Sequence, residues 1–136
     1  MSQTKILLAE DERHTRDAVC LLLENAGYEV LQTGSDREAL SIIDSSRGTA
    51  ASVDLLILDL EIGGRSGIRV LDSLRSRGDL TPAVVITGLS AAEPINRLQA
   101  RGHVEVLRKP FGPEQLASAV SSALAGHQSP QPGPHG

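Results

Sequence analysis

The stretch Val53-Asp54-Leu55-Leu56-Ile57-Leu58-Asp59 is a short apolar run that ends on a carboxylate. Three other short apolar runs in the chain have the same form. They end on Glu10-Asp11, on Thr87 and on Lys109. Continuous runs of Leu, Ile and Val suit parallel strands that are covered on both faces. Because open α/β sheets bind ligands at the carboxyl ends of their strands, we expect these polar residues to form one site.

Segments with helical periodicity alternate with predicted strands along the chain. Strands are predicted at Lys5–Ala9, Glu29–Thr33, Val53–Asp59, Ala83–Thr87 and Val104–Arg108. Helices are predicted at Thr15–Ala26, from Ser35 onward, at Ser66–Arg77, at Ala91–Ala100 and from Gly112 to about Leu124. This alternation predicts a doubly wound parallel sheet, and right-handed crossovers put helices on both of its faces.

Two of the predicted helices begin with recognisable signals. Ser35 and Glu38 have the spacing of a capping box, in which each side chain accepts a hydrogen bond from the other residue's backbone N–H. Pro94 is expected in the first turn of its helix, where the missing N–H costs little. At the other end of a helix, Gly27 is expected to stop the first one.

The composition fits one domain followed by a different kind of segment. The chain has 136 residues, and we predict a single domain at residues 1–125. Gly126–Gly136 contains three prolines and almost no apolar side chains, which predicts a disordered tail or the start of a linker. The formal net charge is −4, and Tyr28 and Phe111 are the only aromatic residues. An acidic chain with so few aromatics is a poor candidate for direct binding of nucleic acid.

The remaining compositional signals concern redox chemistry and cellular location. Cys20 is the only cysteine, so the chain cannot form an internal disulfide, and its apolar neighbours predict a position in the core. Met1–Thr4 leads directly into the first predicted strand. We recognise neither a signal peptide nor an apolar stretch long enough to span a membrane, and we expect a cytoplasmic protein.

The polar residues at the predicted edge suit phosphoryl chemistry. Glu10, Asp11 and Asp59 would bring three negative charges together. Two like charges about 4 Å apart repel by roughly 4 kcal/mol at an effective dielectric near 20, so the cluster needs a cation or a raised pKa. Carboxylates favour Mg²⁺ over zinc. Lys109 offers a charge and Thr87 a hydroxyl to a phosphoryl group, which Asp59 can accept as an acyl phosphate.

Four motifs in order resemble the receiver domain of two-component response regulators. They are Leu7–Glu12, Leu56–Leu60, Val85–Gly88 and Lys109–Phe111. The resemblance covers about residues 5 to 124. It implies a flavodoxin-like fold with a five-stranded parallel sheet in the order 2-1-3-4-5 and helices on both faces. It also implies a signalling switch rather than an enzyme, apart from self-phosphorylation from a phosphodonor and slow self-dephosphorylation.

The resemblance implies a role for each acidic residue. Asp59 corresponds to the phosphoacceptor, which takes a phosphoryl group from a sensor histidine kinase or a phosphotransfer protein. Glu10 and Asp11 correspond to the acidic pair that holds Mg²⁺. Asp59 and the backbone carbonyl of Glu61 correspond to the other metal ligands.

The resemblance also implies how the signal is read. Thr87 corresponds to the switch hydroxyl and Lys109 to the phosphate-binding lysine, and the bond to Pro110 corresponds to one that is cis in the family. Phosphorylation is then expected to change the surface of the fourth helix, fifth strand and fifth helix. This surface would bind an output protein or domain, or a second copy of the chain. It is expected at residues 91–100, 104–107 and 115–124.

Three positions depart from the family pattern. Val106 replaces the usual Tyr or Phe three residues before Lys109, and a valine cannot swing inward as that aromatic does. Gly63 replaces a common proline, which is expected to loosen the loop after Asp59. His103 stands where alanine is usual. These departures concern the readout of the signal and remove no group that phosphorylation needs.

Two other functions stay open. A phosphorylation-independent interaction module is favoured by Val106 and Gly63. A Mg²⁺-dependent phosphohydrolase would also use an aspartyl phosphate, but that class usually has a second Asp where Glu61 stands. Asp54 is an alternative acceptor in principle. It lies five residues before Asp59, roughly 16 Å away along a strand, and is expected at the opposite edge of the sheet.

Overall fold

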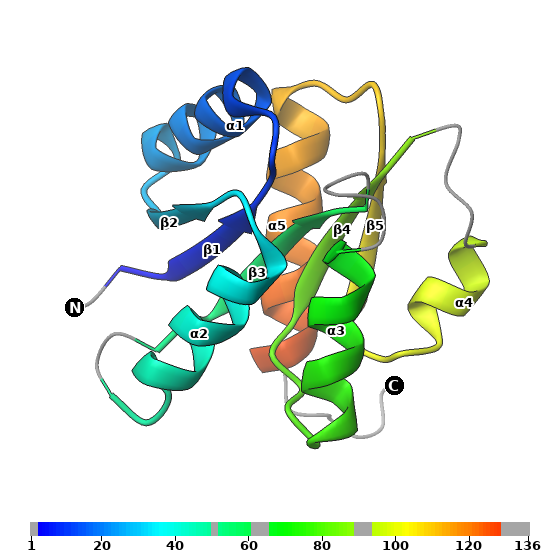
Figure 1. The fold of residues 1–136 in the computed structure, drawn as a ribbon. Coiled ribbons are helices and arrows are strands. Elements are labelled where there is room, and N and C mark those ends of the chain that lie inside the picture. Colours follow the sequence, from blue (N-terminus) through cyan, green and yellow to red (C-terminus); the bar gives the residue numbers. More distant parts are fainter. Residues whose placement is uncertain (1–2, 50–51, 61–65, 89–93, 129–136) are drawn as a thin grey trace.

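The computed structural model describes residues 3–49, 52–60, 66–88 and 94–128. Within these ranges, five strands alternate with five helices (Figure 1). The elements are β1 (Lys5–Ala9), α1 (Arg13–Asn25), β2 (Glu29–Thr33), α2 (Asp36–Ser46), β3 (Leu55–Asp59), α3 (Ser66–Ser76), β4 (Ala83–Thr87), α4 (Ile95–Gln99), β5 (Val104–Arg108) and α5 (Pro113–Gln128). In this part of the chain, no helix has the length and apolar character that crossing a bilayer requires.

The strands form one parallel sheet in the order β2-β1-β3-β4-β5, which confirms the predicted flavodoxin-like order. The register brings the carboxyl ends of the strands to one edge. Asp59 at the end of β3 lies opposite Ile86 of β4, and Thr87 at the end of β4 lies opposite Arg108 of β5. The fold therefore has the edge on which the predicted site depends.

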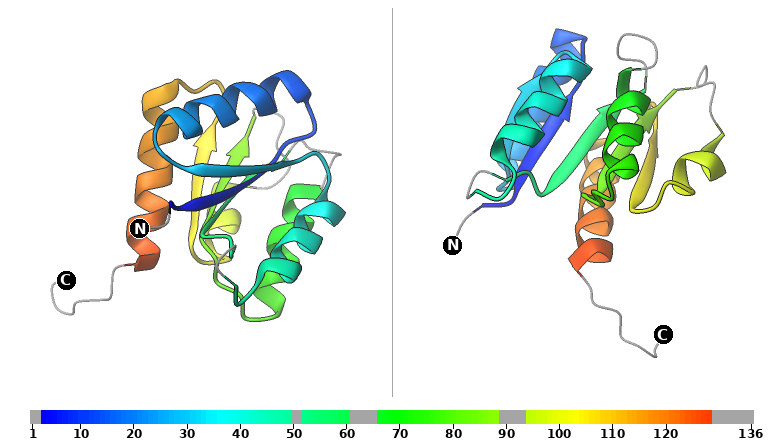
Figure 2. Two further views of the ribbon diagram at one scale, coloured as in Figure 1. Left: turned by 90° about the vertical axis from the view of Figure 1, so that its left-hand side faces the viewer. Right: turned by 60° about the horizontal axis from the view of Figure 1, so that its bottom comes forward.

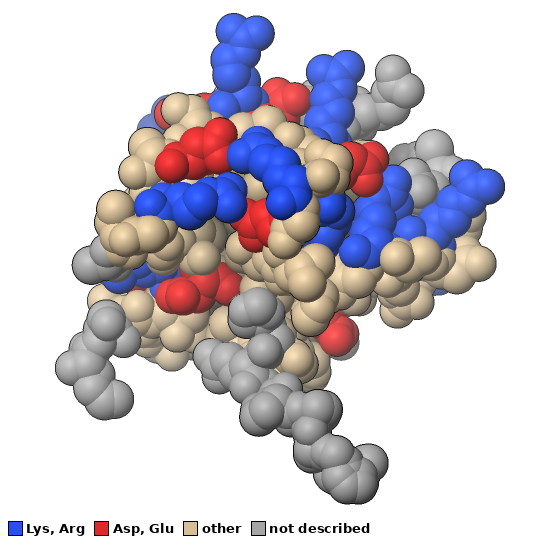
Figure 3. Space-filling model, turned by 90° about the horizontal axis from the view of Figure 1, so that it is seen from below, with Lys and Arg blue, Asp and Glu red and all other residues tan. Residues whose placement is uncertain are grey.

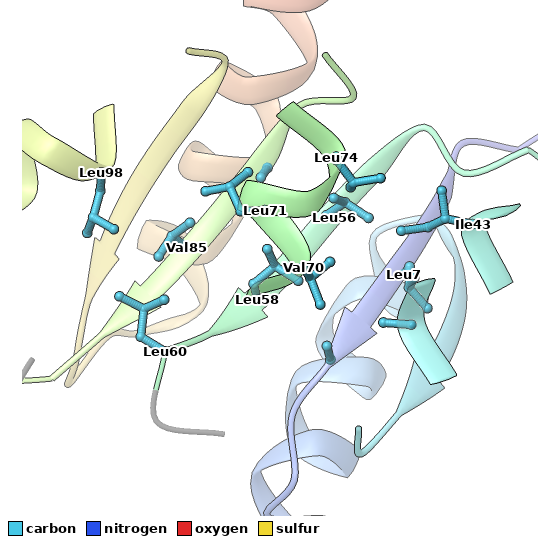
Figure 4. Close-up of a cluster of buried hydrophobic side chains, with 13 residues drawn as sticks. Leu7, Ile43, Leu56, Leu58, Leu60, Val70, Leu71, Leu74, Val85 and Leu98 are labelled. Carbon is cyan, nitrogen blue, oxygen red and sulfur yellow. The ribbon is translucent and has the colours of Figure 1, made fainter. Parts of the chain in front are cut away.

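Helices cover both faces of the sheet. Figure 2 shows α1 and α5 on one side and α2 and α3 on the other, with α4 beside β5. Side chains alternate along β3, where Leu56 and Leu58 face the α2–α3 side and Leu55 and Ile57 face the α1–α5 side. All four are fully buried. Strand β3 is thus the centre of the molecule, and Figure 4 shows the cluster that packs on its α3 side.

Four of the five predicted strands have the predicted bounds, whereas β3 begins at Leu55, two residues later than predicted. Asp54 precedes it and is bonded to the start of β1. Its carboxylate accepts a hydrogen bond from the Lys5 N–H at 2.9 Å, and its own N–H donates to the Lys5 carbonyl at 2.8 Å. Asp54 therefore lies at the amino edge of the sheet, as predicted, far from Asp59.

The start of α2 only partly follows its prediction. Ser35 is the N-cap, and its hydroxyl accepts the Glu38 N–H at 3.1 Å. The reciprocal half of the capping box is wrong. Glu38 accepts a hydrogen bond from the Thr33 hydroxyl, and the Ser35 N–H donates to that same hydroxyl at 3.2 Å. Thr33 is buried at the end of β2, so its hydroxyl needs hydrogen-bond partners. It therefore binds the Glu38 side chain, which the capping box would have paired with the Ser35 N–H.

Other helix ends also differ from prediction. Helix α1 starts two residues early because Glu12 caps it, and it ends at Asn25, one residue early. Helix α3 ends one residue before Arg77, and α4 starts at Ile95. Pro94 is the extended N-cap of α4 and not part of its first turn, and residues 91–93 lie outside the described ranges.

Helix α5 is longer than predicted. It continues four residues beyond Leu124 to Gln128, so residues 126–128, which we assigned to the tail, are helical. Ala123 is buried in the core on the α1–α5 side and Leu124 packs against it, so the helix is still anchored in its final turns. The buried position predicted for Cys20 is confirmed on the same side of the sheet.

Arg75 ties the amino edge of the sheet together. Its guanidinium donates hydrogen bonds to the carbonyls of Asp79 at 2.8 Å, Thr81 at 2.9 Å and Gly102 at 3.1 Å, and a longer one to the carbonyl of His103 at 3.4 Å. Arg77 nearby is more exposed and pairs with Asp44 at 2.6 Å. Figure 3 shows Lys and Arg interleaved with Asp and Glu on this face. The half-buried arginine therefore fixes two loops, whereas its neighbour makes a surface ion pair.

We predict that Arg75→Met destabilises the protein far more than Arg77→Met. Arg75→Met leaves four carbonyls without their charged donor, which should lower the free energy of unfolding by about 2–4 kcal/mol. Arg77→Met removes an exposed ion pair, which is worth less than about 1 kcal/mol. Urea denaturation measures both values, and equal losses would contradict this role of Arg75.

Candidate functional site

The carboxyl edge of the sheet brings predicted site residues together. Asp59, at the end of β3, is 1% exposed, and Glu10, directly after β1, is 4% exposed. Thr87, at the end of β4, is also buried. The Nζ atom of Lys109, directly after β5, lies 2.8 Å from Oδ2 of Asp59. The structure brings Asp59 into contact with Lys109 and with Glu10, and it places Thr87 at the same edge of the sheet. The chemical roles of these residues stay predictions.

Glu10 and Asp59 form a buried acidic pair. Burial, together with the hydrogen bond and the charge of Asp59, raises the pKa of Glu10 from its usual 4.5 to about 8. The Glu12 N–H and the Lys109 ammonium act in the opposite direction. Near neutral pH, and without a bound cation, Glu10 therefore keeps its proton while Lys109 offsets the charge of Asp59.

The donor set of this pair fits Mg²⁺. Two carboxyl groups that are desolvated together provide hard oxygen ligands and a local charge that a divalent cation can replace. Asp11 is exposed, and within residues 3–49, 52–60, 66–88 and 94–128 no three His, Cys, Asp or Glu side chains are grouped to hold a metal. Glu61, whose carbonyl is a predicted ligand, lies outside those ranges. The roles of Asp11 and Glu61 as metal ligands stay predictions.

The loop between β1 and α1 fixes the direction of Glu10. Its Oε2 atom accepts the Glu12 N–H at 3.0 Å, and its carbonyl accepts a hydrogen bond from Nη1 of Arg16 at 2.9 Å. The Glu12 carboxylate caps α1, and a hydrogen bond from Thr15 lowers the pKa of Glu12. The sequence pattern alone did not point to Arg16. Its one signal is a basic residue one turn into the helix that follows the acidic pair.

Strand β5 and the turns on either side of it carry the phosphate-binding candidate and two of the departures. The Lys109–Pro110 peptide is cis, as the resemblance implied. The Lys109 N–H donates to the Thr87 carbonyl at 2.9 Å, which joins the ends of β4 and β5. Val106 is half-buried and packs against the core on the α3 side. His103 has a φ of 56° in the turn before β5, and Gly63 lies outside the described ranges.

Comparison with known proteins finds one family. The model of the response regulator receiver domain matches residues 6–121. Regulatory protein VanR of Enterococcus faecium is 33% identical over 121 residues, which is 88% of this chain and 49% of the relative. The phosphate regulon transcriptional regulatory protein PhoB of Pseudomonas aeruginosa is 32% identical over 122 residues, which is 88% of this chain and 51% of the relative. The chain spans about half the length of these curated relatives.

Solved structures agree with the sheet order. A response regulator receiver domain protein from Clostridium thermocellum has a TM-score of 0.80 at 26% identity, over 92% of this chain and 97% of that one. The chemotaxis protein CheY4 of Vibrio cholerae has a TM-score of 0.75 at 27% identity, over 90% of this chain and 100% of that one.

We predict that Glu10→Gln flattens the pH dependence of stability. Because the folded protein raises the pKa of Glu10 from 4.5 to about 8, the unfolded chain ionises first as the pH rises. The wild type should therefore lose stability relative to Glu10→Gln between pH 4.5 and 8. Urea denaturation in EDTA across this range measures the difference. Glu24→Gln, which changes an exposed carboxylate on α1, should follow the wild type. Parallel curves for wild type and Glu10→Gln would contradict the raised pKa.

Proposed function

Because this chain belongs to the response regulator receiver domain family, we propose that it is a phosphoacceptor switch whose phosphoryl group is carried by Asp59. The observation that carries the proposal is the burial of the Asp59 carboxylate at the end of β3, with the Lys109 ammonium 2.8 Å away. Response regulators interact with histidine kinases and output domains. The proposed donor is a sensor histidine kinase or a phosphotransfer protein, and the proposed setting is the cytoplasm.

In the proposed transfer, an Asp59 oxygen attacks the phosphorus in line. The new O–P bond forms as the bond from the donor imidazole nitrogen breaks. Lys109 neutralises part of the charge that spreads over the phosphoryl oxygens. Receiver domains generally need Mg²⁺ for phosphorylation, and a bound Mg²⁺ supplies further neutralisation of this charge. Glu10, Asp11, Asp59 and the carbonyl of Glu61 would hold it, and Glu10 must first give up its proton.

The proposed switch follows from the charge that phosphorylation adds. A phosphoryl group carries about −1.5 to −2 charges at pH 7. It would draw Lys109 away from its present partner, the Asp59 carboxylate. In the part of the chain that the structure describes, the Thr87 hydroxyl donates one long hydrogen bond, to the Gly88 carbonyl at 3.4 Å, so it could turn to a phosphoryl oxygen at little cost. The backbone bond between Thr87 and Lys109 would carry the movement to β5.

The proposed readout surface consists of α4, β5 and the first part of α5. It would bind an output protein or domain, or a second copy of the chain. VanR and PhoB are regulatory proteins by name, and each is about twice as long as the part that this chain matches. We place the output in a partner or in a domain outside this sequence, and we assign neither DNA binding nor membrane binding to this chain.

A phosphorylation-independent interaction module is the second candidate. Val106 supports it, because a half-buried valine takes the place of the aromatic that moves in the family. Equal binding of an output partner by wild type and Asp59→Asn would favour this candidate. A phosphohydrolase is not favoured, since receiver domains are signalling switches and not classical enzymes. Beyond accepting the phosphoryl group, we propose only slow self-dephosphorylation.

We predict that acetyl phosphate adds one phosphoryl group to the wild type in the presence of Mg²⁺. Asp59→Asn should abolish the adduct, because it removes the attacking carboxylate. Asp54→Asn is the matched control and should keep the adduct, since Asp54 lies at the amino edge of the sheet. Intact-mass spectrometry with and without EDTA measures all three. A full adduct on Asp59→Asn would contradict the assignment.

We predict that phosphorylation changes amide hydrogen exchange in α4, β5 and the first part of α5, but not in β2 or α2. Thr87→Ala should still form the adduct and lose much of the change in β5, because alanine has no hydroxyl that could move to the phosphoryl group. Hydrogen-exchange mass spectrometry on samples of known phosphorylation tests this. An unchanged map over α4–β5–α5 in a fully phosphorylated sample would refute the proposed readout surface.

A further inference from the structure

The backbone around Glu10 is held on two sides. Its N–H donates to the carbonyl of Thr33, at the end of β2, at 3.0 Å. Its carbonyl accepts a hydrogen bond from Nη1 of Arg16 at 2.9 Å. The first bond continues the sheet, whereas the second comes from a side chain on α1. These two bonds fix the backbone of Glu10 on both sides of its Cα atom. They therefore set the direction in which its buried carboxyl group leaves the end of β1.

Arg16 is well placed to hold this loop. It belongs to the first turns of α1, and its own N–H donates to the Glu12 carbonyl at 2.9 Å. The side chain is half-buried and reaches back over the start of the helix to Glu10. The side chain thus links the helix backbone to the Glu10 carbonyl, and its planar guanidinium presents its donors in a fixed geometry.

Gly34 forms the wall against which the guanidinium lies. A Cβ at this position would stand 3.0 Å from Nη1 of Arg16 and 3.8 Å from the Glu10 carbonyl oxygen. Gly34 is not among the glycines with positive φ, so it is needed for space rather than for an unusual backbone conformation. The Thr33 hydroxyl accepts the Ser35 N–H at 3.2 Å and thereby fixes the turn on both sides of Gly34.

We propose that Arg16, lodged against Gly34, is a positioning residue that sets the direction of the Glu10 carboxyl group and through it the affinity of the site for Mg²⁺. The inference rests on the proposed function. It makes a prediction opposite in sign to simple electrostatics. Removing a positive charge near a cation site should tighten Mg²⁺ binding by Coulomb's law. Losing the hydrogen bond from Arg16 to the Glu10 carbonyl should weaken Mg²⁺ binding.

The test is calorimetric titration of Mg²⁺ at one pH and ionic strength. Arg16→Ala should raise the Kd for Mg²⁺ about tenfold, which is the scale of one lost hydrogen bond from a charged group. Arg16→Lys should recover part of the affinity, because an ammonium can still donate to the Glu10 carbonyl. Arg13→Ala is the matched control. It removes a charge from the same helix, at a side chain that is 80% exposed, and should change the Kd less than about twofold.

A second readout needs no metal. In EDTA, Arg16→Ala should speed hydrogen exchange of the Glu10 amide about tenfold relative to Arg13→Ala, because the loop is held by one bond fewer. Gly34→Ala acts on the same contact from the other side and should shift both readouts in the same direction. If Arg16→Ala does not fold, Arg16→Lys and Gly34→Ala decide the question.

The outcomes separate this inference from the proposed function. If the wild type binds Mg²⁺ and folded Arg16→Ala binds it equally or more tightly, the proposed role of Arg16 is wrong. The proposed phosphoacceptor function is not affected by that result. The role of Arg16 is also wrong if Arg16→Lys and Gly34→Ala both leave the Kd for Mg²⁺ and the exchange rate of the Glu10 amide unchanged. A folded wild type that neither binds Mg²⁺ nor forms a phosphoryl adduct overturns both.

Discussion

The contact between the Lys109 ammonium and the buried Asp59 carboxylate is the interaction on which the rest of the site depends. Burial of charged groups is costly, and two acidic side chains buried together cost more. The structure offsets this cost with the lysine and with a proton on Glu10, whose pKa is raised to about 8. Both devices are reversible. In the proposed switch, a cation would replace the proton and a phosphoryl group would attract the lysine, so the balance that permits burial would also make the site responsive.

The two edges of the sheet have different tasks. At the amino edge, the Arg75 guanidinium fixes loops through backbone carbonyls, and Asp54 is bonded to β1. At the carboxyl edge, the Asp59 carboxylate is paired with the Lys109 ammonium, a contact that the proposed phosphoryl group would alter. The fully buried centre of the sheet separates these edges. A rigid core between them allows the carboxyl edge to rearrange without loss of the fold, because core packing tolerates little displacement.

Val106 bears on how a signal would leave the site. In the family, an aromatic at this position moves with the threonine, but here a half-buried valine is already packed against the core. One link that does not need the aromatic is the backbone hydrogen bond from Lys109 to Thr87, between the ends of β5 and β4. In the proposed switch, a movement of either residue is therefore transmitted through the strand ends, toward the neighbouring α4, whose Leu98 packs in the same core.

The sequence by itself determined the strands and the residues that meet at the carboxyl edge. Apolar runs recur with a regular spacing, and parallel strands must end at the same edge, so Glu10, Asp59, Thr87 and Lys109 could be placed without coordinates. Tertiary structure alone decided details that depend on partners distant in the chain. The Thr33 hydroxyl takes the partner role that the capping box predicted for Ser35 and binds Glu38. Ala123 and Leu124 anchor α5 near its end by packing on the core, and Gly34 leaves room for Arg16. Contacts between different elements leave no periodic signal, because they depend on how the elements pack and not on the local pattern of either one.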